Sequence, residues 1–122
     1  MNRRHITVAP QADDDMLEIL LRTARRFGPL TAERNDRLIN QALKDLAVEA
    51  LRLQTMPMFH IQHGLYFYHV RYSRNNIMPV TERIAKPRHY ICFRLPSSME
   101  LQVLRVLHER RRFDKQSYAY DG

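Results

Sequence analysis

Two amphipathic segments follow one another in the first half of the chain, and they constrain the fold more than any other feature. From Asp13 to Phe27, and again from Thr31 to Leu53, apolar residues recur every three or four positions, the spacing that lines one face of a helix. Gly28 and Pro29 end the first helix and leave a connection of about three residues. We therefore expect an antiparallel helical hairpin, with Thr31 as the N-cap of its second helix. The predicted buried stripe of the first helix is Met16, Leu17, Leu20, Leu21, Ala24 and Phe27.

Three consecutive aspartates, Asp13, Asp14 and Asp15, open the first of these helices. Adjacent carboxylates attract hard cations, but successive helical side chains point about 100° apart and do not converge on one ion. We interpret all three as charges that stabilise the helix N-terminus, matched by Arg25 and Arg26 in the last turn. The histidines also lack the spacing of metal ligands, so the sequence predicts no metal and no cofactor.

Strand-like segments flank the helices. Arg4 to Ala9 is short, partly β-branched and followed by Pro10, where we expect the strand to stop. Aromatic and β-branched residues also fill three later segments, residues 64–72, 87–95 and 100–108. The turn-forming residues 96–98 predict a hairpin between the last two. The expected fold is α+β, in the order β-α-α-β-β-β: an N-terminal strand and a helical hairpin packed on one face of a small, mostly antiparallel sheet whose other face is open.

The length of 122 residues predicts one domain, residues 1–122. Within it we expect an insertion loop at about residues 73–86 and a frayed tail at 116–122. Cys92 is the single cysteine, no segment has the pattern of a signal peptide, and the apolar runs are too short to cross a bilayer. We therefore expect a cytoplasmic protein that does not enter a membrane.

Positive charge is concentrated in the second half of the chain. Of the net charge of +7, residues 64–122 account for six, with 11 Lys or Arg against 5 Asp or Glu. The densest cluster, Arg110 to Arg112, directly follows the apolar segment 100–108. A one-sided basic excess implies an anionic partner: a nucleic acid, an acidic protein or a ribonucleoprotein.

Five segments between about Ile6 and Phe113 carry a resemblance to a known family. In order, they are VAPQADDDMLEIL, RRFGPLTAER, GLYFYHV, RHYICFRL and LQVLRVLHER. Together they resemble the ParE branch of the RelE/ParE superfamily, the toxins of type II toxin–antitoxin modules. The resemblance implies a toxin that blocks growth by inhibiting DNA gyrase without cutting nucleic acid. It also implies neutralisation by a cognate antitoxin, a small acidic ParD-like protein, in a hetero-oligomeric complex.

The chain departs from the family pattern at positions where the family contacts its partners. Tyr66 stands where members often have an arginine, and Arg111 and Arg112 replace the usual Met-Asp. We expect partner contacts at these positions and at other basic side chains of the sheet region. The predicted partner-binding residues are Tyr66, Arg71, Arg88, Arg94, Arg110, Arg111 and Arg112.

RelE-like members of the superfamily cut messenger RNA on the ribosome, and this gives the alternative function. Such chemistry needs an acid or base and cations that stabilise the phosphorane charge. The candidates are His108, Arg94, Arg105 and Tyr90. Strand alternation places Arg105 and His108 on opposite faces unless a bulge intervenes, so we favour a protein without catalytic residues. A basic binding module without toxicity is the third possibility.

Overall fold

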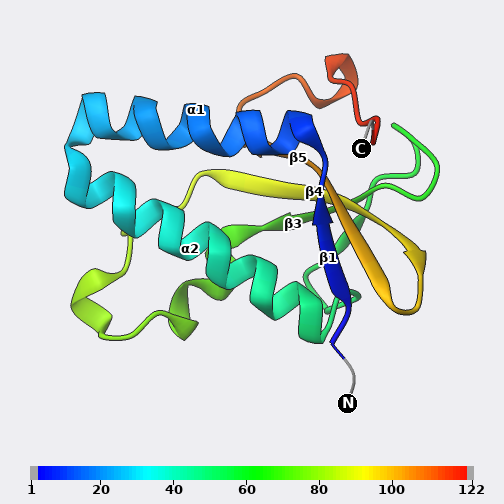
Figure 1. Ribbon diagram of the computed structural model, residues 1–122, viewed down its shortest axis with the longest axis horizontal. Helices are drawn as coiled ribbons and strands as arrows, with labels where there is room; N and C mark the ends of the chain where they lie inside the picture. The colour runs from blue at the N-terminus through cyan, green and yellow to red at the C-terminus, as the bar shows by residue number, and fades with distance from the viewer. Residues whose placement is uncertain (1–2, 121–122) are drawn as a thin grey trace.

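The fold is an α+β sandwich, described for residues 3–120 by a computed structural model (Figure 1). Its elements are β1 (His5–Val8), α1 (Pro10–Phe27), α2 (Pro29–Val48), β2 (Met56–Pro57), β3 (Tyr66–His69), β4 (His89–Ser97) and β5 (Glu100–His108). The five strands form one sheet in the order β1-β5-β4-β3-β2, with β1 parallel to β5 and the other pairs antiparallel. The predicted fold class and order are confirmed, with the two-residue β2 added. Within residues 3–120 no helix is long and apolar enough to cross a membrane.

The helical hairpin is tighter than the sequence predicted. A single residue, Gly28, separates α1 from α2, and its φ of 91° lies in the left-handed region that glycine adopts without strain. Because Pro29 then starts α2 directly, the assignment of Thr31 as N-cap is wrong. The second helix also ends earlier than expected, at Val48, and Leu53 is exposed.

The buried face of α1 is rotated from the predicted stripe. Ala12 is fully buried, and Met16 and Ile19 pack on the main core between the helices and the sheet. Leu17 and Leu21, which we expected inside, are 55% and 51% exposed. The outer side of α1 therefore carries an apolar patch.

A bulge in β5 divides its apolar residues between two cores. Cys92 pairs with Arg105 but Phe93 pairs with Val103, so Leu104 is an extra residue opposite β4. Regular alternation is therefore interrupted at Leu104, by a bulge of the kind for which the sequence analysis allowed. Leu101, Val103 and Val106 pack in the cluster beneath the helices, whereas Leu104 and Leu107 pack in a second cluster.

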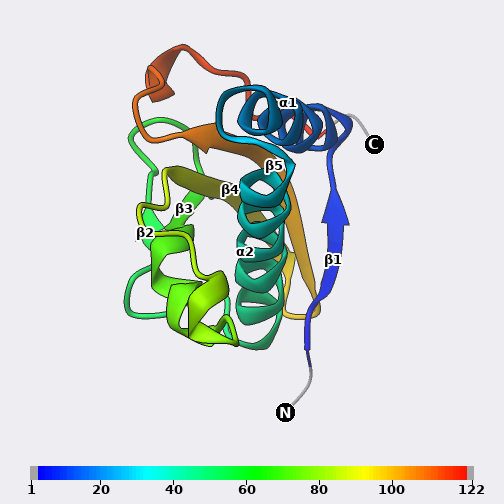
Figure 2. The ribbon, with the colours of Figure 1, turned by 90° about the vertical axis from the view of Figure 1, so that its left-hand side faces the viewer.

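The second cluster covers the sheet face that we expected to be open. Leu65, Phe67, Cys92, Leu104, Leu107 and Tyr118 form it, with Phe113 packed against them. The C-terminal segment, red in Figures 1 and 2, returns over the end of the sheet. Tyr118 is buried and its hydroxyl donates a hydrogen bond to the carbonyl of Phe113 at 2.7 Å. Residues 116–120 are therefore not a frayed tail; positions 121 and 122 lie outside the described residues.

Residues 70–86 form an irregular but bonded segment beside α2 (Figure 2). The strand predicted through Tyr72 ends at His69, and a 3₁₀ helix, Val70–Asn76, follows. Arg83 donates to the carbonyls of Ile77 and Asn75 at 2.9 and 2.8 Å. At least one of the basic side chains in the C-terminal half, Arg83, thus stabilises the backbone of this segment.

Candidate functional site

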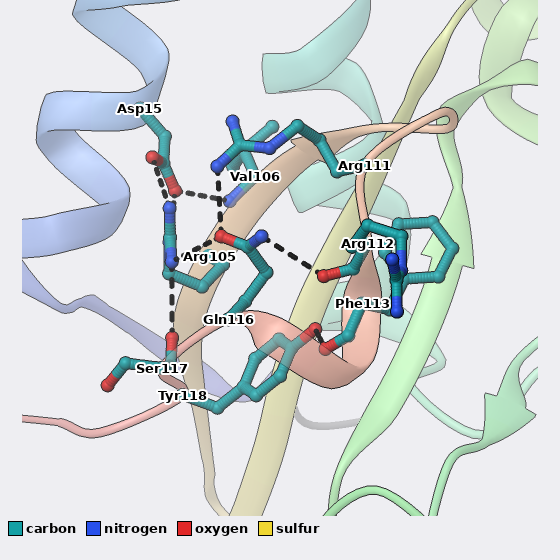
Figure 3. Close-up of polar contacts among 9 residues, drawn as sticks. All are labelled: Asp15, Arg105, Val106, Arg111, Arg112, Phe113, Gln116, Ser117 and Tyr118. Atoms are coloured by element: carbon teal, nitrogen blue, oxygen red, sulfur yellow. Dashed lines mark hydrogen bonds and ion pairs between the residues drawn. The ribbon is translucent and has the colours of Figure 1, made fainter.

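Arg105, one of the four candidate residues for nuclease chemistry, lies in a buried ion pair with Asp15 (Figure 3). Arg105 Nε and Nη2 donate to the two carboxylate oxygens at 2.7 and 3.0 Å, and the N–H of Val106 donates to the same carboxylate at 3.0 Å. The side chains of Arg105 and Asp15 are only 7% and 11% exposed. Asp15 is therefore not a helix-terminal charge as predicted, because α1 begins at Pro10 and Asp15 lies beyond its first turn, against β5.

Arg105 also holds the C-terminal segment. Its Nη1 donates to the carbonyl of Ser117 at 3.3 Å and to Oε1 of Gln116 at 3.4 Å. The hydrogen bonds that Arg105 donates to Asp15 raise the pKa of the guanidinium further above its ordinary value. This arginine joins α1, β5 and the tail, and its positive charge is already neutralised by the Asp15 carboxylate.

The structure does not gather the four nuclease candidates into one site. Tyr90 packs between the rings of Phe67 and Phe113, each 5.5 Å away between centroids. Arg94 is exposed, donates to the side chain of Gln102 and lies 5.9 Å from the centre of the Tyr120 ring.

His108 lies apart from Arg105, as strand alternation predicted. The bulge at Leu104 precedes both residues, so it leaves their relative orientation unchanged. Nδ1 of His108 accepts the N–H of Arg110 at 3.1 Å, and burial lowers its pKa. The imidazole thus bonds to the backbone where β5 ends.

A second buried ionisable side chain, His69 at the end of β3, is paired with Glu109, which follows β5. His69 is buried; its Nδ1 accepts the N–H of Arg71 at 3.1 Å, so Nε2 is the donor to Glu109, 2.9 Å away. Arg88 donates to the other oxygen of Glu109 at 2.9 Å. Arg88 first, and then His69, lower the pKa of Glu109 to about 2. Both nitrogens of His69 are engaged, so this pair has no free base.

The predicted partner-binding residues divide into separate groups. Arg88, Arg110 and Arg111 line one cleft. The other four lie elsewhere: Tyr66 stacks on Phe93, Arg71 lies over Tyr72, Arg94 is beside Tyr120, and Arg112 pairs with Asp114.

The cleft has a volume of about 470 Å³ and lies between α1, the start of α2 and the adjoining ends of β4 and β5. Arg22, Arg26 and Lys86 line it together with the three arginines named above. None of these three cations is among the partner-binding residues predicted from the sequence. The spacing of Arg22 and Arg26, four residues apart on one side of α1, was the available signal. Among residues 3–120 no group of three or more His, Cys, Asp or Glu is placed to hold a metal ion.

Comparison with known proteins identifies the family. A search of curated proteins gives no match. The model of the family described as "ParE toxin of type II toxin-antitoxin system, parDE" matches residues 6–113. That range runs from β1 through both helices and all later strands to the residue that begins the C-terminal 3₁₀ turn. The chain therefore belongs to the ParE toxin family of type II toxin–antitoxin systems.

Proposed function

We propose that this toxin blocks growth by inhibiting DNA gyrase without cleaving a nucleic acid. We further propose that a small acidic, ParD-like antitoxin neutralises it in a hetero-oligomeric complex in the cytoplasm. Gyrase as the target follows from the resemblance to ParE-like toxins. The observation that supports inhibition without cleavage is the ion pair between Arg105 and Asp15. It neutralises the charge of Arg105, the most buried of the candidate cations.

The chemistry of RNA cleavage explains why this observation matters. Attack by a ribose hydroxyl needs a base and an acid within about 3 Å of the reacting oxygens and cations beside the phosphorane. Here Arg105 and Tyr90 are packed into the protein, and His108 lies on the other face of β5. This arrangement supports a toxin that does not cleave RNA.

The outer side of α1 supports the antitoxin proposal. Leu17 and Leu21 are one helical turn apart and half exposed, beside Asp14, Glu18 and Arg25. Exposed apolar residues at this spacing are typical of a surface that receives an amphipathic helix. The net charge of +7 favours an acidic partner and makes its association sensitive to salt.

The decisive experiment compares the two targets with the same preparation. The toxin is purified with its antitoxin, released, and added to a gyrase supercoiling assay and to a translation assay in which transcript ends are mapped. We expect inhibition of supercoiling with intact transcripts. Cut transcripts, abolished by His108→Gln and accompanied by normal supercoiling, would establish the nuclease instead. Unimpaired growth during controlled expression would support a binding module without toxicity.

The electrostatic part of the antitoxin proposal has its own test. Replacing Arg110, Arg111 and Arg112 with alanine should slow association with the antitoxin and reduce its dependence on salt. Association rates measured at low and high salt report this effect directly. Unchanged rates and affinity would show that these arginines do not contact the antitoxin.

A further inference from the structure

We propose that the cleft between α1 and the ends of β4 and β5 is a binding site for a nucleoside di- or triphosphate. This inference is independent of the gyrase proposal, because it concerns a small ligand and is tested by binding alone. The cleft is on the helix side of the sheet, away from the second cluster, against which Tyr90 packs. Its volume of about 470 Å³ is within the usual range of small-molecule sites.

The charge of the cleft is strongly positive and largely unneutralised. Six Lys or Arg line it together with two carboxylates. Arg22 pairs with Glu18 and Arg88 pairs with Glu109, which leaves four positive charges unpaired among the described residues. Both carboxylates are already engaged, Asp15 with Arg105 and Glu18 with Arg22 at 2.8 Å. Within residues 3–120 no carboxylate pairs with Arg26, Lys86, Arg110 or Arg111. A nucleoside di- or triphosphate carries roughly three to four negative charges at neutral pH, which matches this excess.

His89 lines the same cleft and carries a polar atom without a partner among the described residues. Nδ1 of His89 is buried and has no hydrogen-bond partner among the described residues. Burial, together with the nearby His108, lowers the pKa of His89 to about 4, so the ring is neutral at physiological pH. The neutral ring therefore lines the cleft without adding charge to it, and the positive charge of the cleft comes from its Lys and Arg side chains.

The walls of the cleft favour a nucleotide over a bare anion. Ile19, Phe27, Ile84 and Val106 supply apolar surface between the cations. Small-ligand sites typically combine such walls with a few polar groups that fix orientation. A nucleic acid would instead require basic side chains spread along one face. Here the cations come from α1, residues 86–88 and the end of β5 and surround a single hollow.

Isothermal titration calorimetry of the full chain tests the proposal. The probes are ADP, ATP, adenosine, inorganic pyrophosphate and a single-stranded oligonucleotide, at about 0.15 M salt. We expect saturable binding of ADP or ATP that is tighter than that of adenosine or pyrophosphate, since only the nucleotide uses both the walls and the cations. Binding of the oligonucleotide without binding of ADP or ATP would overturn the proposal, as would the absence of any binding.

Two adjacent arginines give a matched pair of variants. Arg111 lines the cleft, whereas Arg112 does not line it and pairs with Asp114. Arg111→Glu should weaken ADP binding by about tenfold or more, or roughly 1.4 kcal/mol, and Arg112→Glu should leave it nearly unchanged. Lys86→Glu, on a different wall, should weaken binding in the same way. Thermal melting checks that each variant is folded; equal losses for Arg111→Glu and Arg112→Glu would show only nonspecific attraction.

Discussion

Replacing Arg105 with methionine should destabilise the protein more than any single substitution of an exposed arginine. Methionine keeps much of the length of the side chain but removes two charge-assisted hydrogen bonds to Asp15, at 2.7 and 3.0 Å. The carboxylate, 11% exposed, then keeps the N–H of Val106 as its remaining bonded donor. Removing one partner of a buried ion pair costs about 3–5 kcal/mol, because the other charge stays buried and uncompensated.

Urea unfolding followed by circular dichroism measures this loss, and the corresponding fall in melting temperature is about 10–20 °C. Asp15→Asn should cost less, because the amide oxygen can still accept the N–H of Val106. The double variant should be more stable than the sum of the two single losses predicts, by about 1–3 kcal/mol, since it leaves no unpaired charge.

An exposed ion pair provides the control for this cycle. Arg112 and Asp114 are 3.5 Å apart and their side chains are 74% and 59% exposed. Arg112→Met should therefore change stability by at most about 0.5 kcal/mol. If Arg105→Met cost no more than this control, or if the two losses simply added in the double variant, the ion pair would not anchor α1 to β5.

Three other properties are open to measurement. Tyr118→Ala should cost about 3–5 kcal/mol in urea unfolding because it leaves a cavity in the second cluster, whereas Tyr118→Phe should lose only about 1 kcal/mol with the bond to the carbonyl of Phe113; equal losses would argue against burial as the cause. The folded pKa of His89 is about 4 against an ordinary 6.5, so the unfolded chain binds more protons between these values and stability falls as the pH drops through them, by up to about 1.4 kcal/mol per pH unit for this group. Unfolding of His89→Gln at several pH values should show a shallower slope, while Glu109, with its pKa lowered to about 2 from 4.5, loses its contribution only below about pH 4.5. The thiol of Cys92 is fully buried and burial raises its pKa, so iodoacetamide should modify it only as fast as the protein opens, and rapid labelling of folded protein would contradict this.

The helical hairpin was predictable because its signals act over short stretches of chain. The apolar repeat and the pair Gly28-Pro29 determine where the helices lie and where the first one ends. The same local patterns do not determine which side of α1 is buried. Leu17 and Leu21 fit a helical stripe as well as Met16 and Ile19 do, and only the position of the sheet decides which pair is buried.

The second cluster and the ion pair of Asp15 with Arg105 were not predictable, because they form between distant parts of the chain. Asp15 and Arg105 are 90 positions apart, and three adjacent aspartates look equivalent in the sequence. Asp15 does differ from its neighbours, since it is three residues from the buried Ala12 and four before Ile19, on the inner side of α1. The bulge was partly visible too, because Val103 and Val106 are both apolar but fall on opposite parities of a regular strand.

The arginine cluster after β5 is connected to the core through one glutamine. Oε1 of Gln116 accepts from Arg111 at 2.9 Å and from Arg105 at 3.4 Å (Figure 3). Nε2 of the same amide donates to the carbonyl of Arg112 at 3.0 Å. The position of Arg111 at the cleft therefore depends on the tail, and the tail depends on the buried pair of Arg105 with Asp15. Arg111 is therefore not part of an independent basic tail. Its orientation depends on the same ion pair that joins α1 to the sheet.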